Sequence, residues 1–198
     1  MRYLTRLAFV LSSILFVSAT NADHVVPRLI VVGNSISTTH HSWPNVLGDL
    51  SDRWAIHVMA QNGRTIRDFS FPRDLWTAGN QNDTVVYFLG GNDILQRNHV
   101  DFAKYRLQLH ANFLLQRNFK VLLVMPPNFG LDEEMFGESN RQHRKIFEDL
   151  RGTHPRLWVY DIDAVWDPAG TSDGIHPDDE LSYEIAQAIN WVLAMNIY

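Results

Sequence analysis

The stretch RLIVVG, residues Arg28–Gly33, decides how we interpret this chain, because Asn34 and Ser35 follow it directly. Its apolar residues run without polar alternation, a pattern typical of a strand buried on both faces of a sheet. Runs of the same kind predict four more strands, at Ala55–Ala60, Asp83–Gly90, Phe119–Met125 and Leu157–Ile162. A sheet of such strands needs helices on both faces to separate it from water.

Segments with the apolar spacing of helices separate these runs. They predict helices at Trp43–Arg53, Thr65–Thr77, Asp101–Asn118, Ser139–Arg151 and Asp178–Met195, the second one interrupted by Pro72. Alternating strands and helices imply right-handed crossovers between parallel strands. The sequence therefore predicts an α/β protein, a three-layer α/β/α domain with a flavodoxin-like, five-stranded parallel sheet.

The bulk composition limits the class of protein. The 198 residues, 45% of them hydrophobic, suffice for one well-buried domain and are too few for two ordinary ones. The net charge of -5 and the lack of a long basic run give no reason to expect a nucleic-acid partner. The chain has no cysteine, which excludes a disulfide framework, a thiolate zinc site and a Cys nucleophile.

The N-terminus has the organisation of a secretory signal peptide. Arg2 and Arg6 precede the apolar run Leu7–Val17, and small residues follow as far as Ala22. We therefore expect residues 1–22 to be a signal peptide, residues 23–198 to form a single domain, and the protein to be secreted or periplasmic. The alternative is an uncleaved membrane anchor, although the run is shorter than the about 20 residues that span a bilayer.

Polar residues suited to acyl transfer follow the predicted strands. Ser35 comes after the first strand, Gly63 after the second and Asn92 after the third, and Asp173 and His176 precede the last helix. In parallel sheets, ligands bind beyond the carboxyl ends of the strands. A Ser hydroxyl needs a base such as His to take its proton, and an Asp three residues before that His can orient the imidazole.

The same chemistry requires donors for the oxyanion of a tetrahedral intermediate. The backbone N–H groups of Ser35 and Gly63 and the side-chain amide of Asn92 are the candidates for this oxyanion hole. A glycine at position 63 leaves its N–H open to approach. This chemistry needs no cofactor and no metal ion.

Four segments resemble the conserved blocks of the SGNH (GDSL) hydrolase superfamily, over nearly the whole predicted mature chain. Gly90–Asp93 is similar to the family's G-x-N-D block, and Asp173–His176 is similar to its D-x-x-H block. Ser42–Pro44 and Pro127–Gly130 resemble the bacterial periplasmic thioesterase, lysophospholipase and arylesterase branch. The resemblance implies a triad of Ser35, His176 and Asp173, with an oxyanion hole of Ser35, Gly63 and Asn92.

The first block departs from the family pattern. Where the family has Gly-Asp-Ser-Leu, this chain has Gly33-Asn34-Ser35-Ile36. An Asn side chain accepts hydrogen bonds from nearby backbone groups as Asp does, but it carries no charge. The substitution therefore changes the electrostatic field beside the expected nucleophile, and it leaves the nucleophile itself in place.

The leading interpretation is an enzyme that cleaves carboxylic esters or thioesters through an acyl-enzyme. Its substrate would be a small-molecule or lipid ester, such as an acyl ester, a lysophospholipid-like ester or an aryl ester. The alternatives are a carbohydrate O-acetylesterase of the same fold and a non-catalytic glycan- or lipid-binding relative. A metal-dependent hydrolase using Asp173, His176 and either His40 or His41 is a further alternative.

Some features of the sequence stay open at this level. Phe129, Leu131, Met135 and Phe136 fit an acyl pocket and the protein core equally well. No segment beyond the signal peptide has the length and apolar character of a membrane span. Nothing in the sequence fixes the oligomeric state.

Overall fold

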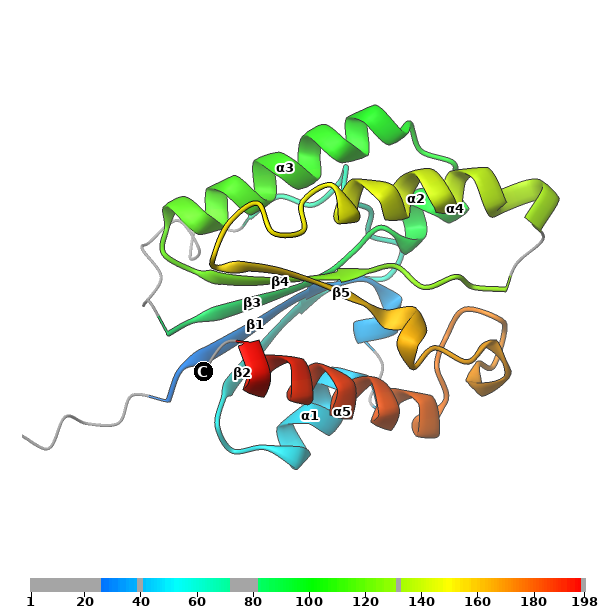
Figure 1. Ribbon diagram of the computed structural model, residues 1–198. Coiled ribbons are helices and arrows are strands. Elements are labelled where there is room, and N and C mark those ends of the chain that lie inside the picture. Colours follow the sequence, from blue (N-terminus) through cyan, green and yellow to red (C-terminus); the bar gives the residue numbers. More distant parts are fainter. Residues whose placement is uncertain (1–25, 39–40, 72–81, 131–132, 197–198) are drawn as a thin grey trace, which may run out of the picture.

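The computed structural model describes residues 26–38, 41–71, 82–130 and 133–196. Within these ranges, five strands form one parallel sheet in the order β2-β1-β3-β4-β5 (Figure 1). The strands are β1 (Arg28–Gly33), β2 (Ala55–Ala60), β3 (Thr84–Phe88), β4 (Lys120–Met125) and β5 (Leu157–Asp161). The predicted five-stranded parallel sheet is confirmed, and β1 lies inside it with β2 and β3 as neighbours.

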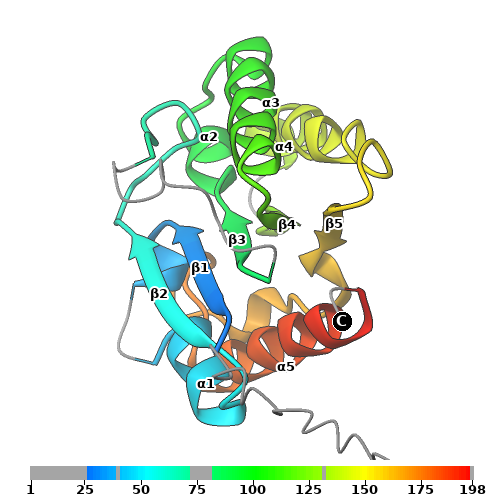
Figure 2. The same cartoon turned by 90° about the vertical axis from the view of Figure 1, so that its left-hand side faces the viewer.

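Helices cover both faces of the sheet. The helices are α1 (Trp43–Leu50), α2 (Gly91–Leu95), α3 (Val100–Gln116), α4 (Glu133–Glu148) and α5 (Asp179–Asn196). Figure 2 shows α1 and α5 on one side of the sheet and α2, α3 and α4 on the other. Short 3-10 turns, η1 (Ser35–Ser37), η3 (Ile162–Ala164) and η4 (Pro168–Gly170), follow β1 and β5. The predicted three-layer α/β/α architecture is thus confirmed.

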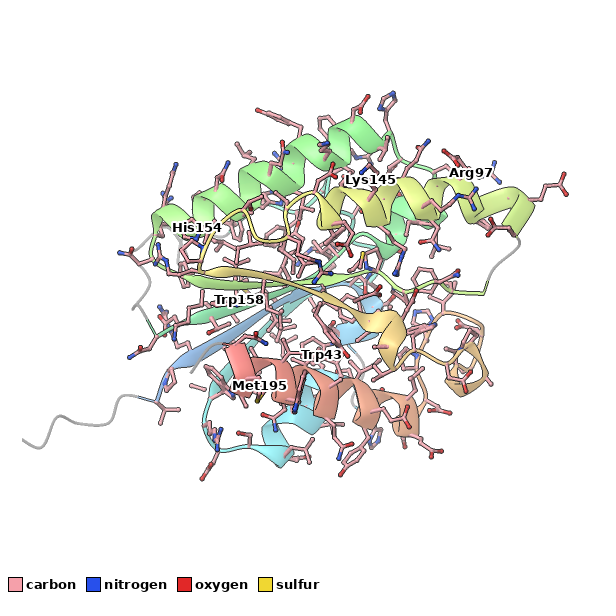
Figure 3. The ribbon with its side chains drawn as sticks, in the orientation of Figure 1. Trp43, Arg97, Lys145, His154, Trp158 and Met195 are labelled. Carbon is pink, nitrogen blue, oxygen red and sulfur yellow. The ribbon has the colours of Figure 1, made fainter. Side chains whose placement is uncertain are left out.

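The sheet separates two apolar cores. Successive side chains of a strand point to opposite faces. In β3, Val85 and Tyr87 accordingly join the core under α3, and Val86 and Phe88 join the core under α1 and α5. All five residues of β3 are buried. Figure 3 shows Trp43, which is fully buried, on the α1–α5 side of the sheet.

The sequence placed most elements correctly and three segments incorrectly. β1, β2 and the start of α1 lie where they were predicted, whereas α4 begins at Glu133, six residues before the expected Ser139. The predicted helix Thr65–Thr77 is wrong over residues 65–71, which form one turn at residues 66–68 and otherwise irregular backbone, and residues 72–77 lie outside the described ranges. α2 was not predicted, because the sequence has no helical pattern between the third strand and Asp101.

Residues 65–71 are not helical, and both local and distant hydrogen bonds hold them. The Thr65 hydroxyl donates to the Asp68 carboxylate at 2.7 Å and accepts from the Asp68 amide at 3.1 Å. The Phe69 amide also donates to the Thr65 carbonyl at 3.2 Å, so one helix-like turn forms, and Pro72 disfavours a helical conformation of the residue before it. In addition, the Ile66 amide donates to the carboxylate of Asp93 on α2. The segment is therefore held by other parts of the molecule rather than by a helix of its own.

Two further expectations concern the chain termini and membranes. The expected signal peptide, residues 1–22, lies outside the described ranges, so the structure does not test it. Among the helices that the structure describes, none is long and apolar enough to cross a bilayer.

A buried polar pair joins the sheet to α3. The Tyr87 hydroxyl and Nδ1 of His110 are 2.8 Å apart, and both side chains are almost completely buried. Burial, helped by the positive charge of Arg106, lowers the pKa of His110 to about 4. The imidazole is therefore neutral at physiological pH. Arg106 also donates to the Phe69 carbonyl at 2.6 Å, which fixes the segment after β2 on α3.

The pKa of His110 makes the stability of the protein depend on pH. An unfolded chain binds a proton at this imidazole below about pH 6.5, and the folded protein does so only below about 4. As the pH falls from 6.5 to 4, this group should remove roughly 3 kcal/mol from the free energy of unfolding. Urea unfolding at several pH values within this window measures the loss.

His110→Gln, which removes the titrating group, should flatten the curve between pH 6.5 and 4. Tyr87→Phe is the matched control, because it deletes the same hydrogen bond and keeps the imidazole, so it should retain the pH dependence. If the free energy of unfolding depends on pH in the same way in the wild type and in His110→Gln, His110 is not the group responsible.

Candidate active site

Ser35 begins η1 directly beyond the carboxyl end of β1. Asn34 caps this turn: its Oδ1 accepts from the Ile36 amide at 3.1 Å, and its side chain is buried. This is the backbone contact that the sequence led us to expect from an Asn in place of Asp. Gly33 is required by close packing, because a Cβ there would lie 2.5 Å from the Ser37 hydroxyl oxygen. Ser35 is therefore presented on a tightly packed turn.

Ser35, His176 and Asp173 form one hydrogen-bonded chain. His176 Nε2 is 2.9 Å from Ser35 Oγ, and His176 Nδ1 is 2.7 Å from Asp173 Oδ2. The side chains of His176 and Asp173 are 37% and 51% exposed, so these hydrogen bonds are accessible to solvent. The structure thus brings together the three residues that the sequence singled out, although Ser35 and His176 are 141 positions apart.

The loop of Asp173 and His176 is organised by the carboxylate itself. Besides the imidazole, Asp173 accepts from the backbone amides of His176 and Ile175, at 2.8 and 3.0 Å. The hydrogen bond from the His176 side chain, followed by that from its backbone, lowers the pKa of Asp173. Gly174 has a φ of 82°, a conformation that glycine adopts without strain. Asp173 is accordingly ionised at neutral pH and oriented toward the imidazole.

The predicted oxyanion donors come from three adjacent strand ends. Gly33 of β1 is in register with Ala60 of β2 on one side and with Phe88 of β3 on the other. The segments that carry Ser35, Gly63 and Asn92 therefore leave the sheet side by side. A Cβ added to Gly63 would meet nothing within 4 Å, so the space beside its backbone is open.

Contacts between these segments fix the surroundings of Gly63. The Thr38 hydroxyl, at the end of η1, donates to the Asn62 side chain at 2.6 Å. On the other side, Asn92 Nδ2 donates to the Arg64 carbonyl at 3.0 Å. An amide nitrogen has two N–H groups, so this contact leaves one for a ligand. Sequence reasoning missed Thr38, because a hydroxyl three residues after a serine has no distinctive spacing.

The apolar residues after β4 have different environments. Phe129 is buried, and its ring meets that of Trp166 edge-on at a centroid distance of 5.6 Å, so it is a core residue. It also packs closely on Gly91, where a Cβ would lie 2.9 Å from its ring. Met135 is exposed, Phe136 is half-buried beneath Arg97, and Leu131 lies outside the described ranges.

In the described part of the chain, no three His, Asp, Glu or Cys side chains cluster closely enough to hold a metal ion. Of the two histidines considered as further ligands, His41 is exposed and His40 lies outside the described ranges.

Comparison with solved structures identifies proteins that share this fold. No protein-family model matches the chain, and no curated protein sequence matches it. Among solved structures, a lipolytic protein of the G-D-S-L family from Veillonella parvula matches with a TM-score of 0.71 and 15% identity, over 85% of this chain and 98% of that one. The chain has the SGNH hydrolase fold.

Other structures with the SGNH fold match to a similar extent. A putative acylhydrolase from Bacteroides fragilis has a TM-score of 0.66 and 18% identity, over 89% of this chain and 90% of that one. A carbohydrate esterase of family 3 from Talaromyces cellulolyticus has a TM-score of 0.63 and 17% identity, over 86% and 98%. The structural relatives are thus hydrolases and esterases, and at these identities the likeness concerns the fold.

Proposed function

We propose that this protein is a serine hydrolase of carboxylic esters or thioesters. The observation that carries the proposal is the hydrogen-bonded chain from Asp173 through His176 to Ser35. It contains a nucleophile, a base within reach of the proton and a carboxylate that orients the base. A non-catalytic relative would have no need for this arrangement. The esterases among the structural relatives support the same reaction class.

The geometry suits acylation of Ser35. Ser35 Oγ attacks the carbonyl carbon of the ester while its proton passes to His176 Nε2. Asp173 holds the Nδ1 proton and stabilises the resulting imidazolium. The negative charge on the carbonyl oxygen is met by the N–H groups of Ser35 and Gly63 and by the free N–H of Asn92. When the intermediate collapses, His176 returns its proton to the departing alcohol or thiol.

Deacylation reverses the roles with water in place of the alcohol. His176 takes a proton from the water, whose oxygen attacks the acyl carbon of the ester on Ser35. The same donors stabilise the second oxyanion. Collapse releases the carboxylic acid, and the proton on His176 returns to Ser35 Oγ. One ester bond and one water molecule are consumed, and the residues used need no cofactor.

Two classes of ester are candidates for the substrate. The sequence resemblance favours longer acyl, lysophospholipid-like or aryl esters. A carbohydrate O-acetylesterase is the second candidate, because the structural relatives include a carbohydrate esterase and an acetyl esterase. The half-exposed His176 and Asp173 suit an acyl group carried on a bulky alcohol, since such a substrate approaches an open site most easily.

We also propose that the protein acts outside the cytoplasm, on the basis of the predicted signal peptide. When the full chain is expressed in a bacterium, the exported form should begin at Asp23 or Thr20, after cleavage behind Ala22 or Ala19. N-terminal sequencing measures this. An exported protein that still begins at Met1 would favour the uncleaved anchor instead.

Ser35→Ala should lower kcat for a p-nitrophenyl ester by at least about 10³-fold, because the nucleophile is gone. The same variant should not react with a fluorophosphonate, which labels activated serines, as detected by mass spectrometry of the intact protein. The control is Ser70→Ala, because Ser70 is exposed and is not one of the three hydrogen-bonded residues. This variant should keep the wild-type kcat and should still be labelled by the fluorophosphonate. Full labelling of Ser35→Ala would overturn the proposal.

The acyl preference separates the two substrate classes. With p-nitrophenyl esters of increasing chain length, an O-acetylesterase should prefer acetate, and an enzyme for lipid-like esters should have a higher kcat/KM on longer chains. We expect the longer chains to be preferred. A strong preference for acetate would instead support the carbohydrate esterase. Ser35→Ala run in parallel corrects each rate for hydrolysis that does not depend on the site.

A further inference from the structure

Asp93 is a buried carboxylate that the proposed mechanism does not use. Its side chain is fully buried. One oxygen accepts from the Ile66 amide at 2.8 Å, and the other accepts from Asn98 Nδ2 at 3.2 Å. Burial raises the pKa of Asp93, and these two hydrogen bonds oppose that rise. Removing a carboxylate from water is costly unless hydrogen bonds compensate for it, so a buried acid at this position calls for an explanation.

The contact with Ile66 joins two of the segments that carry predicted oxyanion donors. Ile66 lies three residues after Gly63, and Asp93 follows Asn92 directly in α2. Asn92 itself donates to the Arg64 carbonyl. Two consecutive residues of α2 therefore hold the segment after β2 at two points, a carbonyl at position 64 and an amide at position 66.

Other contacts of the segment do not reach the predicted donors: Arg106 on α3 donates to the Phe69 carbonyl at 2.6 Å, and the side chains of Ile66 and Phe69 are buried in the core. Gly63 has a φ of 71°, and residues 65–71 form no helix. Before Gly63, the Thr38–Asn62 hydrogen bond ties the segment to the nucleophile turn. After it, the bonds from Asn92 and Asp93 tie it to α2. Gly63 thus lies between the Thr38 contact on the β1 side and the two contacts from α2 on the β3 side.

We infer that Asp93 is a positioning residue, which fixes the segment after β2 on α2 so that the Gly63 N–H and the Asn92 amide meet the same oxyanion. The inference rests on the proposed function, because it needs an oxyanion at Ser35. The loss of rate expected when Asp93 is removed follows from known effects at such sites. A displacement of about 1 Å from productive geometry can cost about 10²-fold in rate, and the loss of a whole donor costs about 10²–10³-fold.

A purely structural role for Asp93 is the competing explanation, and Asn98 separates the two. Asn98 contacts the same carboxylate, but it lies in the turn between α2 and α3, and its own amide donates to the Asp93 carbonyl. Asn98→Ala therefore removes a hydrogen bond from the buried carboxylate and leaves the bond to Ile66 intact. Asp93→Ala removes both, and Asp93→Asn keeps an acceptor oxygen for the Ile66 amide.

The test compares these three variants by kcat and KM on a p-nitrophenyl ester and by hydrogen exchange of the Ile66 amide. Asp93→Ala should lower kcat by about 10²-fold with KM nearly unchanged, and it should accelerate exchange of the Ile66 amide. Asp93→Asn should recover kcat to within about tenfold of the wild type. Asn98→Ala should lower the thermal stability but keep kcat within about twofold and leave the exchange of Ile66 as in the wild type.

Equal losses of kcat in Asp93→Ala and Asn98→Ala would overturn the inference, and so would wild-type exchange of Ile66 in Asp93→Ala. If Asp93→Ala does not fold, Asp93→Asn decides: slow exchange with kcat near the wild-type value supports the inference, and a loss as large as about 10²-fold with slow exchange contradicts it. Failure of the proposed function has a different signature, namely undiminished activity of Ser35→Ala. The exchange of Ile66 is measured without any turnover, so it reports on the contact of Asp93 in either case.

Discussion

The parallel pairing of β1 with β2 and β3 is the constraint on which the rest of the site depends. Because Gly33 is opposite both Ala60 and Phe88, three strands end at one level of the sheet, about 4.8 Å from one neighbour to the next. The strands are fixed by the two apolar cores that pack on the sheet. The polar segments beyond them therefore begin from rigid points, and only short stretches of chain have to be positioned by polar contacts.

Those polar contacts differ in their burial. The hydrogen bond from Thr38 to Asn62 is exposed, and the contacts of Asp173 and His176 are open to solvent. In contrast, Asp93 and Asn34 are buried, and each accepts a backbone amide from an irregular segment. A hydrogen bond in the interior is stronger electrostatically and is costly to break. Asn34 and Asp93 therefore hold the backbone of the candidate site in place, whereas the exposed residues remain accessible to a substrate.

The fold was largely predictable because its strands are apolar without alternation and its polar residues fall at their ends. RLIVVG and AIHVMA became β1 and β2 at the predicted bounds. Thr65–Phe71 could not be predicted, because the amide of Ile66 is held by Asp93, 27 positions away. A pattern in the local sequence carries no information about such a partner. α2 was missed for a related reason: Gly90 and Gly91 have low helix propensity, and glycine is needed there because a Cβ would lie 3.3 Å from Phe147 at position 90 and 2.9 Å from Phe129 at position 91.

The candidate site was predictable as a set of residue types, and less so as a set of contacts. Ser35, Asp173 and His176 could be selected by their order and by their places at strand and helix ends. Their hydrogen bonds depend on the loop at Gly174 and on the turn that Asn34 caps, which no spacing reveals. The Asn92 amide was expected to face a ligand, but one of its N–H groups donates a hydrogen bond to the Arg64 carbonyl.

The distance along the chain between Ser35 and His176 also determines when the site can exist. The serine is among the first residues of the folded domain to leave the ribosome, and the histidine follows 141 positions later, just before the last helix. A nascent or unfolded chain therefore has the Ser35 hydroxyl without the imidazole of His176 beside it. On the proposed function, the chain would hydrolyse no ester until the loop that carries His176 reaches Ser35. The separation of the two residues along the sequence is enough to cause this delay.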